Sequence, residues 1–270
     1  MAKIFKDKIC WITGASSGIG AALARQLAKK GAKLILSGRD VEALAKVDAE
    51  CGGGHLVLPF ETTDYDALPA MADKAHAFAG RIDMLVNNAG ISQRSLAIET
   101  PFPVYQKIVA VDLLAPIALT QLVLPHMVRQ GSGRIVMISS VAGKVGSPMR
   151  TGYSAAKHGL VGYADALRVE TEGLGLQIHV IAPGSIKTEV SRNSIIADGS
   201  KRGQSDPAIE NGMDADHAAK LMLKAIARGE REIILARGIE RHIAKLRRQS
   251  PNKLFDLMSK LFASGYADKM

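Results

Sequence analysis

A tyrosine and a lysine four residues apart, Tyr153 and Lys157, have the clearest chemical use in this sequence. On a helix, side chains at this spacing share one face. An ammonium group stabilises a neighbouring phenolate, which would let Tyr153 give or take a proton near neutral pH. Ser140 lies 13 residues earlier, at the end of an apolar run, where a hydroxyl can bond a substrate oxygen. Each feature alone is usually structural, but together they predict acid–base chemistry, with Ser140 and Tyr153 contacting the substrate.

A glycine-rich segment near the N-terminus fits the binding of phosphate groups. It follows the first apolar run and leads into a helical pattern. Glycines let a ligand approach the backbone, and the N–H groups of a helix N-terminus bind pyrophosphate. A glycine-rich turn without a ligand is the alternative, but the position after the first strand favours a dinucleotide. The candidate binding residues are Gly14, Ser16, Ser17, Gly18, Ile19 and Gly20.

The end of the second apolar run, Lys33 to Ser37, bears on which dinucleotide is bound. Sites for NAD usually place a carboxylate there for the ribose 2′-hydroxyl. Arg39 stands at this position instead, and its guanidinium suits a 2′-phosphate. The alternative is a solvated surface arginine beside Asp40 as a helix cap. The sequence therefore favours NADP over NAD.

Taken together, these motifs resemble those of the short-chain dehydrogenase/reductase family. The resemblance spans about residues 6 to 235 and rests on Thr13 to Gly20, Asn87 to Gly90, Ser140, Tyr153 with Lys157, and Pro183-Gly184. It implies hydride transfer between a bound nicotinamide cofactor and a carbonyl or alcohol. It also implies a homodimer or homotetramer formed through two long helices.

The resemblance gives the candidate residues their roles. It implies that Tyr153 is the general acid in carbonyl reduction, that Lys157 holds the nicotinamide ribose, and that Ser140 orients the carbonyl. The further cofactor contacts that it implies are Glu61 and Thr62 near the adenine, Asn88 beside the ribose, and Ile186 and Thr188 near the nicotinamide.

Two positions depart from the family pattern. Asp112 stands where the family usually has asparagine, and Glu61 stands where it usually has aspartate. Asparagine at the first position supports a water-linked proton path to the lysine. An ionised aspartate accepts hydrogen bonds but donates none. We therefore expect Asp112 to belong to the catalytic group, paired with Lys157, and the proton path to differ.

The elements that must position these residues alternate between strand and helix, which is typical of a doubly wound parallel α/β sheet, the Rossmann fold. We expect one domain, residues 1–235. The expected strands are Lys8 to Thr13, Lys33 to Ser37, His55 to Pro59, Met84 to Asn87, Arg134 to Ile138, Gln177 to Ile181 and Glu232 to Leu235. The expected helices are Gly18 to Lys30, Asp40 to Glu50, Asp66 to Phe78, Pro103 to Gln130, Ser154 to Leu174 and Asp214 to Arg228.

Two segments fall outside this alternation. Glu189 to Met213 is polar, without periodicity, and long for a loop in a compact domain, as lids often are. Residues 236–270 predict a basic, amphipathic helical extension. Three readings of the extension stay open: packing on its own domain, peripheral contact with anionic lipid, or contact with a partner or a cover over the substrate entrance. An apolar extension beside the loop suggests a lipophilic carbonyl substrate.

Composition excludes several other classes. The chain has 270 residues, 47% of them hydrophobic and 23% charged, as in folded globular proteins. Its net charge is +9, of which +5 lies in Arg228 to Met270, and aromatic residues make up only 4%, so we expect no nucleic-acid partner. Two cysteines and unclustered histidines predict no disulfide framework and no metal site. The polar N-terminus leaves no room for a signal peptide core, so we expect a cytoplasmic protein.

The sequence thus predicts an NADP-dependent oxidoreductase that interconverts a carbonyl and an alcohol. The alternative from another class is an NADP-binding sensor or scaffold with weak or no turnover, which Asp112 would favour and which the basic tail could attach to a membrane. Such a protein would bind the cofactor tightly and reduce no carbonyl.

Overall fold

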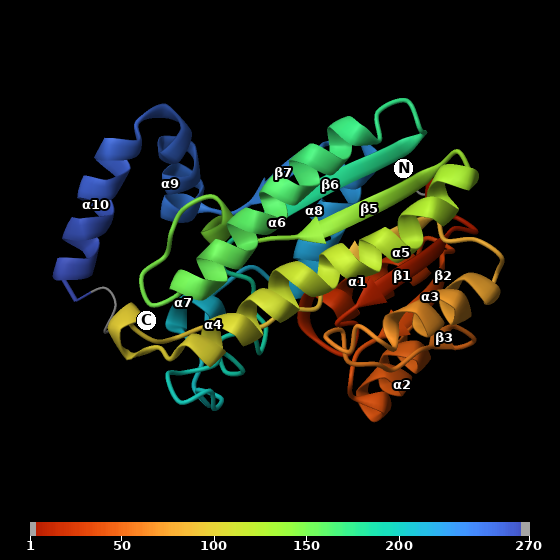
Figure 1. Cartoon of the computed structure of the whole chain (residues 1–270), viewed down its shortest axis with the longest axis horizontal. Coiled ribbons are helices and arrows are strands. Elements are labelled where there is room, and N and C mark those ends of the chain that lie inside the picture. The colour runs from red at the N-terminus through yellow and green to blue at the C-terminus, as the bar shows by residue number, and fades with distance from the viewer. Residues whose placement is uncertain (1–3, 266–270) are drawn as a thin grey trace.

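The computed structural model of the chain describes residues 4–265. Within this range, seven parallel strands form one sheet in the order β3-β2-β1-β4-β5-β6-β7 (Figure 1). The strands are β1 (Ile9–Thr13), β2 (Lys33–Ser37), β3 (Leu56–Val57), β4 (Met84–Asn87), β5 (Gly133–Ile138), β6 (Leu176–Pro183) and β7 (Glu232–Leu235).

Helices connect and cover the strands. The α-helices are α1 (Gly18–Ala28), α2 (Val41–Glu50), α3 (Leu68–Ala77), α4 (Phe102–Val109), α5 (Ala115–Arg129), α6 (Thr151–Glu170), α7 (Pro207–Glu210), α8 (Ala215–Ala227), α9 (Gly238–Gln249) and α10 (Pro251–Ala263). Shorter turns are η2 (Ala97–Glu99), η3 (Ala110–Leu114) and η4 (Val141–Gly143).

Two apolar cores, one on each face of the sheet, hold the fold together. On one face α1, α2 and α8 pack on the strands, with Leu23, Leu44 and Met222 fully buried. On the other face α3, α5 and α6 do so, with Val123 and Leu160 fully buried. Strands covered on both faces need apolar side chains throughout, and all five residues of β1 are buried. The doubly wound α/β fold predicted from the sequence is confirmed.

The strand order reverses between β1 and β4, which are neighbours in the sheet although β2 and β3 lie between them in sequence. Ligands bind at such a reversal, beyond the carboxyl ends of the strands. The segments that follow β1, β4, β5 and β6 therefore surround one crevice.

The segment expected as one helix, Pro103 to Gln130, is correct in extent but not in winding. A π-helical turn, η3, separates α4 from α5, and the hydrophobic pattern of the sequence gives no sign of it. This 28-residue stretch is apolar and long enough to cross a membrane, yet its residues Leu119, Val123 and Met127 are buried in the core beneath the sheet. It packs as a sheet-covering helix.

Further expectations need smaller corrections. The helix expected from Ser154 to Leu174 is α6, which begins at Thr151 and ends at Glu170. β3 pairs only through Leu56–Val57, and α3 begins at Leu68, with a proline in its first turn. The expected loop from Glu189 to Met213 contains α7 and is tied by the isolated bridges of Gln93 with Ile195 and of Ile195 with Lys201.

The C-terminal extension forms two helices that contact each other, α9 and α10. They lie at the end of the molecule toward which β5 points (Figure 1). α10 turns Leu254 inward, whereas Phe255 and Phe262 stay exposed. β7 ends at Leu235, so a division between the Rossmann domain and the extension near residue 235 stays our proposal. The last five residues of the expected extension lie outside the described range.

Candidate active site

The glycine-rich turn between β1 and α1 forms one wall of the crevice. Gly14 and Gly18 have φ angles of +63° and +53°, a backbone conformation that favours glycine. A Cβ on Gly14 would lie 2.9 Å from the Ala89 Cα, and a Cβ on Gly20 would overlap the carbonyl oxygen of Gly14. The turn therefore requires glycine, and it brings the N-terminus of α1 to the crevice.

Asn88 fixes this turn to the end of β4. Its side-chain amide donates hydrogen bonds to the carbonyl oxygens of Thr13 at 2.9 Å and Gly14 at 3.1 Å. Its backbone N–H donates to the Thr13 hydroxyl at 3.0 Å. Asn88 thus lines the crevice and also holds the turn, a second task that its place in the sequence does not reveal.

Arg39 lies at the open rim, where its side chain is 73% exposed. Its Nη1 is 3.3 Å from Oε2 of Glu61, so the two form an exposed ion pair. The other carboxylate oxygen of Glu61 accepts hydrogen bonds from the Thr62 hydroxyl and the Thr63 N–H, both at 3.3 Å. An exposed ion pair is worth roughly 0–1 kcal/mol, so Glu61 holds Arg39 only weakly.

The tyrosine and lysine project from the first two turns of α6. The Nζ of Lys157 lies 5.6 Å from the centroid of the Tyr153 ring. It donates a hydrogen bond to the carbonyl oxygen of Ile138 at 3.1 Å, which ties α6 to the end of β5. Ser140 follows β5, and its Oγ accepts a hydrogen bond from the Ala142 N–H at 3.1 Å. Its hydroxyl proton remains available for another acceptor.

Two polar residues that the sequence did not single out hold α6 in place. Gln93 is fully buried, and its Oε1 accepts hydrogen bonds from the N–H groups of Gly152 at 2.9 Å and Tyr153 at 3.4 Å. Ser139 donates to the carbonyl oxygen of Lys157 at 3.1 Å. Both act on positions distant in sequence, so no local pattern indicates them.

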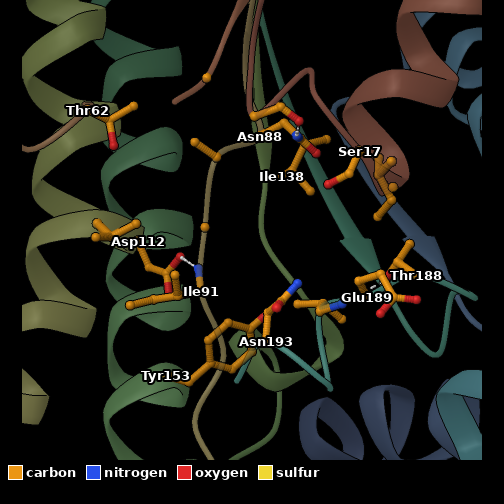
Figure 2. A pocket seen from close by; sticks show the side chains of 18 of the residues that line it. Ser17, Thr62, Asn88, Ile91, Asp112, Ile138, Tyr153, Thr188, Glu189 and Asn193 are labelled. Carbon is orange, nitrogen blue, oxygen red and sulfur yellow. Dashed lines mark hydrogen bonds between the residues drawn. The ribbon is translucent and has the colours of Figure 1, made fainter. Parts of the chain in front are cut away.

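Asp112 projects from the π-helical turn into the same group and is fully buried. One carboxylate oxygen lies 3.4 Å from the Lys157 Nζ and accepts a hydrogen bond from the Ile91 N–H at 3.1 Å (Figure 2). Burial raises the pKa of Asp112 from 3.8 to about 6, although the charge of Lys157 opposes this. Burial acts to lower the pKa of Lys157, but the charges of Asp112 and Tyr153 outweigh it and the pKa lies above its usual value. The two groups form a buried ion pair at neutral pH.

The turn after β6 closes the far side of the crevice. Ile186 is buried, and its backbone bridges to Met213 at the far end of the long loop. Thr188 lies against the glycine-rich turn, since a Cβ on Gly18 would be 3.1 Å from its Cγ2. The expected nicotinamide-side residues therefore lie opposite the start of α1.

These groups line one cavity of about 720 Å³, within the range of about 300–1,000 Å³ that ligand pockets span. Figure 2 shows Ser17, Thr62, Thr188 and Tyr153 around it. The candidate residues at its edge are Gly14, Ser16, Ser17, Gly18, Ile19, Arg39, Glu61, Thr62, Asn88, Asp112, Ser140, Tyr153, Lys157, Ile186 and Thr188. Gly20 lies behind the turn and acts by leaving room for it.

The residues present fit a nicotinamide dinucleotide. The glycine-rich turn and the N-terminus of α1 offer backbone N–H groups to a pyrophosphate, and both Arg39 and Tyr153 line the same cavity. Among residues 4–265, no group of three or more histidine, cysteine, aspartate or glutamate side chains could hold a metal ion.

Comparison with known proteins settles the family. The sequence profile of the short chain dehydrogenases matches residues 8–198. The chain belongs to the short-chain dehydrogenase/reductase family. It is 38% identical over 240 residues to dehydrogenase/reductase SDR family member 7B of Danio rerio, covering 86% of this chain and 78% of that protein. It is 37% identical over 235 residues to SDR family member 7 of Homo sapiens, covering 84% and 69%.

Solved structures share most of this architecture. A short-chain dehydrogenase/reductase from Burkholderia phymatum in complex with NAD has a TM-score of 0.81 and 25% identity, covering 92% of this chain and 95% of that one. Levodione reductase has a TM-score of 0.78 and 29% identity, covering 87% and 98%. This short-chain dehydrogenase/reductase is therefore an oxidoreductase that acts on CH–OH or C=O groups. Its fold is one that binds a nicotinamide cofactor.

Proposed function

We propose that the protein transfers a hydride between NADP(H) and a lipophilic carbonyl or alcohol substrate, with Tyr153 as the general acid and base. The observation that supports this most is the convergence of Tyr153, Lys157, Ser140 and Asp112 on one cavity that also contains the glycine-rich turn. The bound nicotinamide supplies the hydride.

The chain's own residues orient the carbonyl oxygen and transfer the proton to it. In reduction, the Ser140 hydroxyl donates a hydrogen bond to the carbonyl oxygen and orients it. The Tyr153 hydroxyl gives its proton to that oxygen as negative charge develops there. The ammonium of Lys157 stabilises the phenolate that remains and binds the nicotinamide ribose. The Asp112 carboxylate holds the ammonium in place through the buried ion pair.

The walls on the substrate side support a lipophilic substrate. Tyr153 packs against an apolar cluster that includes Ile91 and Ile195. Val190 and Ile209, from the long loop between β6 and α8, also line the cavity. The same loop also contributes the polar Glu189, Asn193 and Lys201, and the apolar side chains beside them support a carbonyl on a hydrophobic framework.

Arg39 supports the choice of NADP. No carboxylate follows directly on β2, and Arg39 lies at the rim where a ribose 2′-phosphate would reach it. Its partner Glu61 is half-exposed, so the pair is easily exchanged for a doubly charged phosphate. The Burkholderia phymatum relative was solved in complex with NAD, so both nucleotides are compared in the test below.

Replacing Arg39 tests the cofactor assignment. In Arg39→Ala we expect the Kd for NADPH to rise about tenfold and that for NADH to change less than about twofold, since only NADPH carries the 2′-phosphate. Calorimetric titration of both nucleotides measures this, with Arg228→Ala, another exposed arginine of an ion pair, as the control. Wild-type protein that binds NADH more tightly than NADPH would refute the assignment.

We place the protein in the cytoplasm, with α9 and α10 as the surface for peripheral membrane contact. The exposed Phe255 and Phe262, beside Arg247 and Lys260, support contact with anionic lipid. We expect the protein to co-sediment with anionic vesicles and to be released at high salt. Co-sedimentation that persists unchanged at high salt, or that never occurs, would contradict this proposal.

A further inference from the structure

The first turn of α9 reaches back to the crevice through one carboxylate. Glu240 accepts three hydrogen bonds from Ser185, the second residue after β6. The Ser185 N–H lies 3.1 Å and 3.0 Å from its two oxygens, and the Ser185 hydroxyl donates to Oε1 at 2.7 Å. Hydrogen bonds to a charged acceptor are about twice as strong as neutral ones.

Gly184 makes room for this carboxylate. A Cβ on Gly184 would overlap Oε2 of Glu240, so a larger residue at position 184 would push the carboxylate away. The Gly184 N–H donates to the carbonyl oxygen of Leu235 at 2.9 Å, which holds the turn against the end of β7. The Pro183-Gly184 pair and Glu240 therefore form one packed unit, although they lie more than fifty residues apart.

The segment held by Glu240 leads directly into the cofactor side of the cavity. The Ser185 carbonyl oxygen accepts a hydrogen bond from the Met213 N–H, and the Lys187 N–H donates to the Met213 carbonyl oxygen, both at 2.9 Å. Glu240 thus fixes the segment through Ser185 while Met213 fixes it through the backbone. Ile186 and Thr188, which lie between and beyond these anchors, line the cavity.

Other contacts also attach α9 to the domain, so the position of Glu240 is fixed. Ala244 is buried, and α9 contacts η4, the turn that follows Ser140. Arg248 pairs with Glu232 at the start of β7 at 2.6 Å, and Lys144 pairs with the same carboxylate at 3.4 Å. The extension therefore touches both turns that border the reacting end of the cavity.

An ordinary first-turn glutamate would only interact with the dipole of its own helix. Glu240 instead accepts its hydrogen bonds from another element, one that borders the cavity. We propose that Glu240 is a positioning residue that holds the Gly184–Thr188 segment for the nicotinamide half of the cofactor and thereby couples α9 to cofactor binding. The inference rests on the proposed function, because it assumes that a nicotinamide dinucleotide occupies the cavity.

The test compares the binding of whole dinucleotides with the binding of ADP, which lacks the nicotinamide half that this segment would contact. Full-length wild type, Glu240→Ala and Ser185→Ala are titrated with NADPH, NADH and ADP, and the thermal unfolding of each is recorded. We expect Glu240→Ala to bind the preferred dinucleotide about tenfold more weakly and ADP unchanged. Ser185→Ala loses one of the three hydrogen bonds, so we expect a smaller effect in the same direction. Glu230→Gln, a surface carboxylate paired with Arg228, is the control.

The outcomes separate the two claims. Weaker dinucleotide binding with unchanged ADP binding supports the role of Glu240, because general destabilisation would weaken both. An equal loss of affinity for the dinucleotide and for ADP, or no change in either affinity, would overturn this role. Wild-type protein that binds neither dinucleotide nor ADP would overturn the proposed cofactor site, and this inference with it.

Discussion

Burial has the largest effect on the pKa of Asp112, the ion-pair partner of Lys157. Asp112 is fully buried and faces the ammonium of Lys157, which in turn lies near Tyr153. Its pKa of about 6 means that desolvation outweighs the attraction of Lys157. Within the described residues, Oδ2 of Asp112 has no hydrogen-bond partner, which adds to the cost of ionising it. An asparagine at this position would carry no such cost.

This burial predicts a pH-dependent stability. Because folding raises the pKa of Asp112 from 3.8 to about 6, the folded protein keeps a proton that the unfolded chain has lost. The free energy of unfolding of the wild type should therefore fall, relative to Asp112→Asn, as the pH rises from about 4 to about 6. We expect a relative fall of up to about 3 kcal/mol.

Urea unfolding at several pH values measures this difference. Asp165→Asn, which changes an exposed aspartate on α6, is the control and should track the wild type. The account is contradicted if the free energy of unfolding of the wild type, minus that of Asp112→Asn, stays constant or rises between pH 4 and pH 6. Burial would then not raise the pKa of Asp112.

Site residues were predictable from sequence where a motif has a local cause. The glycine-rich turn and the Tyr153/Lys157 spacing follow from backbone and helix geometry, and their members line the cavity. Gln93, Ser139 and Glu240 were not predicted, because each acts on a partner that only the folded chain brings near. The Arg39–Glu61 pair was missed for the same reason.

At the level of elements, the π-helical turn is the feature with the largest effect on the site. It adds a residue to one turn of a continuous helix, and Asp112 lies within it. Such single π-turns occur often at functional sites. The apolar pattern across residues 102–129 is continuous, so sequence periodicity predicts the helix but not the turn. Hydrophobic periodicity otherwise placed the strands and the sheet-covering helices well, because each of these buries one face on the sheet or in it.

The outer sides of α5 and α6 support the expected homo-oligomer. Apolar side chains remain exposed there and on η3, with Val169 at 72%, Leu114 at 46% and Val128 at 38% exposure. A further subunit that covers these helices would bury them. We therefore predict a solution mass at least twice that of one chain, reduced by Val169→Asp.

Light scattering at several protein concentrations measures the mass. Val41→Asp is the matched control, because Val41 is a similarly exposed valine on α2, on the other face of the sheet. A monomeric wild type would contradict the prediction, as would an equal loss of mass in both variants.

At the scale of the whole molecule, the fold brings four segments from distant parts of the chain to one crevice. The turns after β1, β4, β5 and β6 meet where the strand order reverses, and α9 supports two of them from outside. The alternation of strand and helix in the sequence predicts this meeting point. Packing of the extension on its own domain was one of the readings left open by the sequence, but the contacts that attach it could not be predicted, since they join side chains of segments without a shared pattern.

The most direct test of the account is the oxidation of NADPH by wild type and Tyr153→Phe over a panel of lipophilic and polar carbonyls. Tyr163→Phe, on the same helix, is the control, and cofactor binding is measured in all three proteins. We predict that Tyr153→Phe binds NADPH within about twofold of wild type but turns over about 10²–10⁴-fold more slowly. Turnover by Tyr153→Phe at the wild-type rate would contradict the account, as would a wild type that binds NADPH tightly and reduces no carbonyl of the panel.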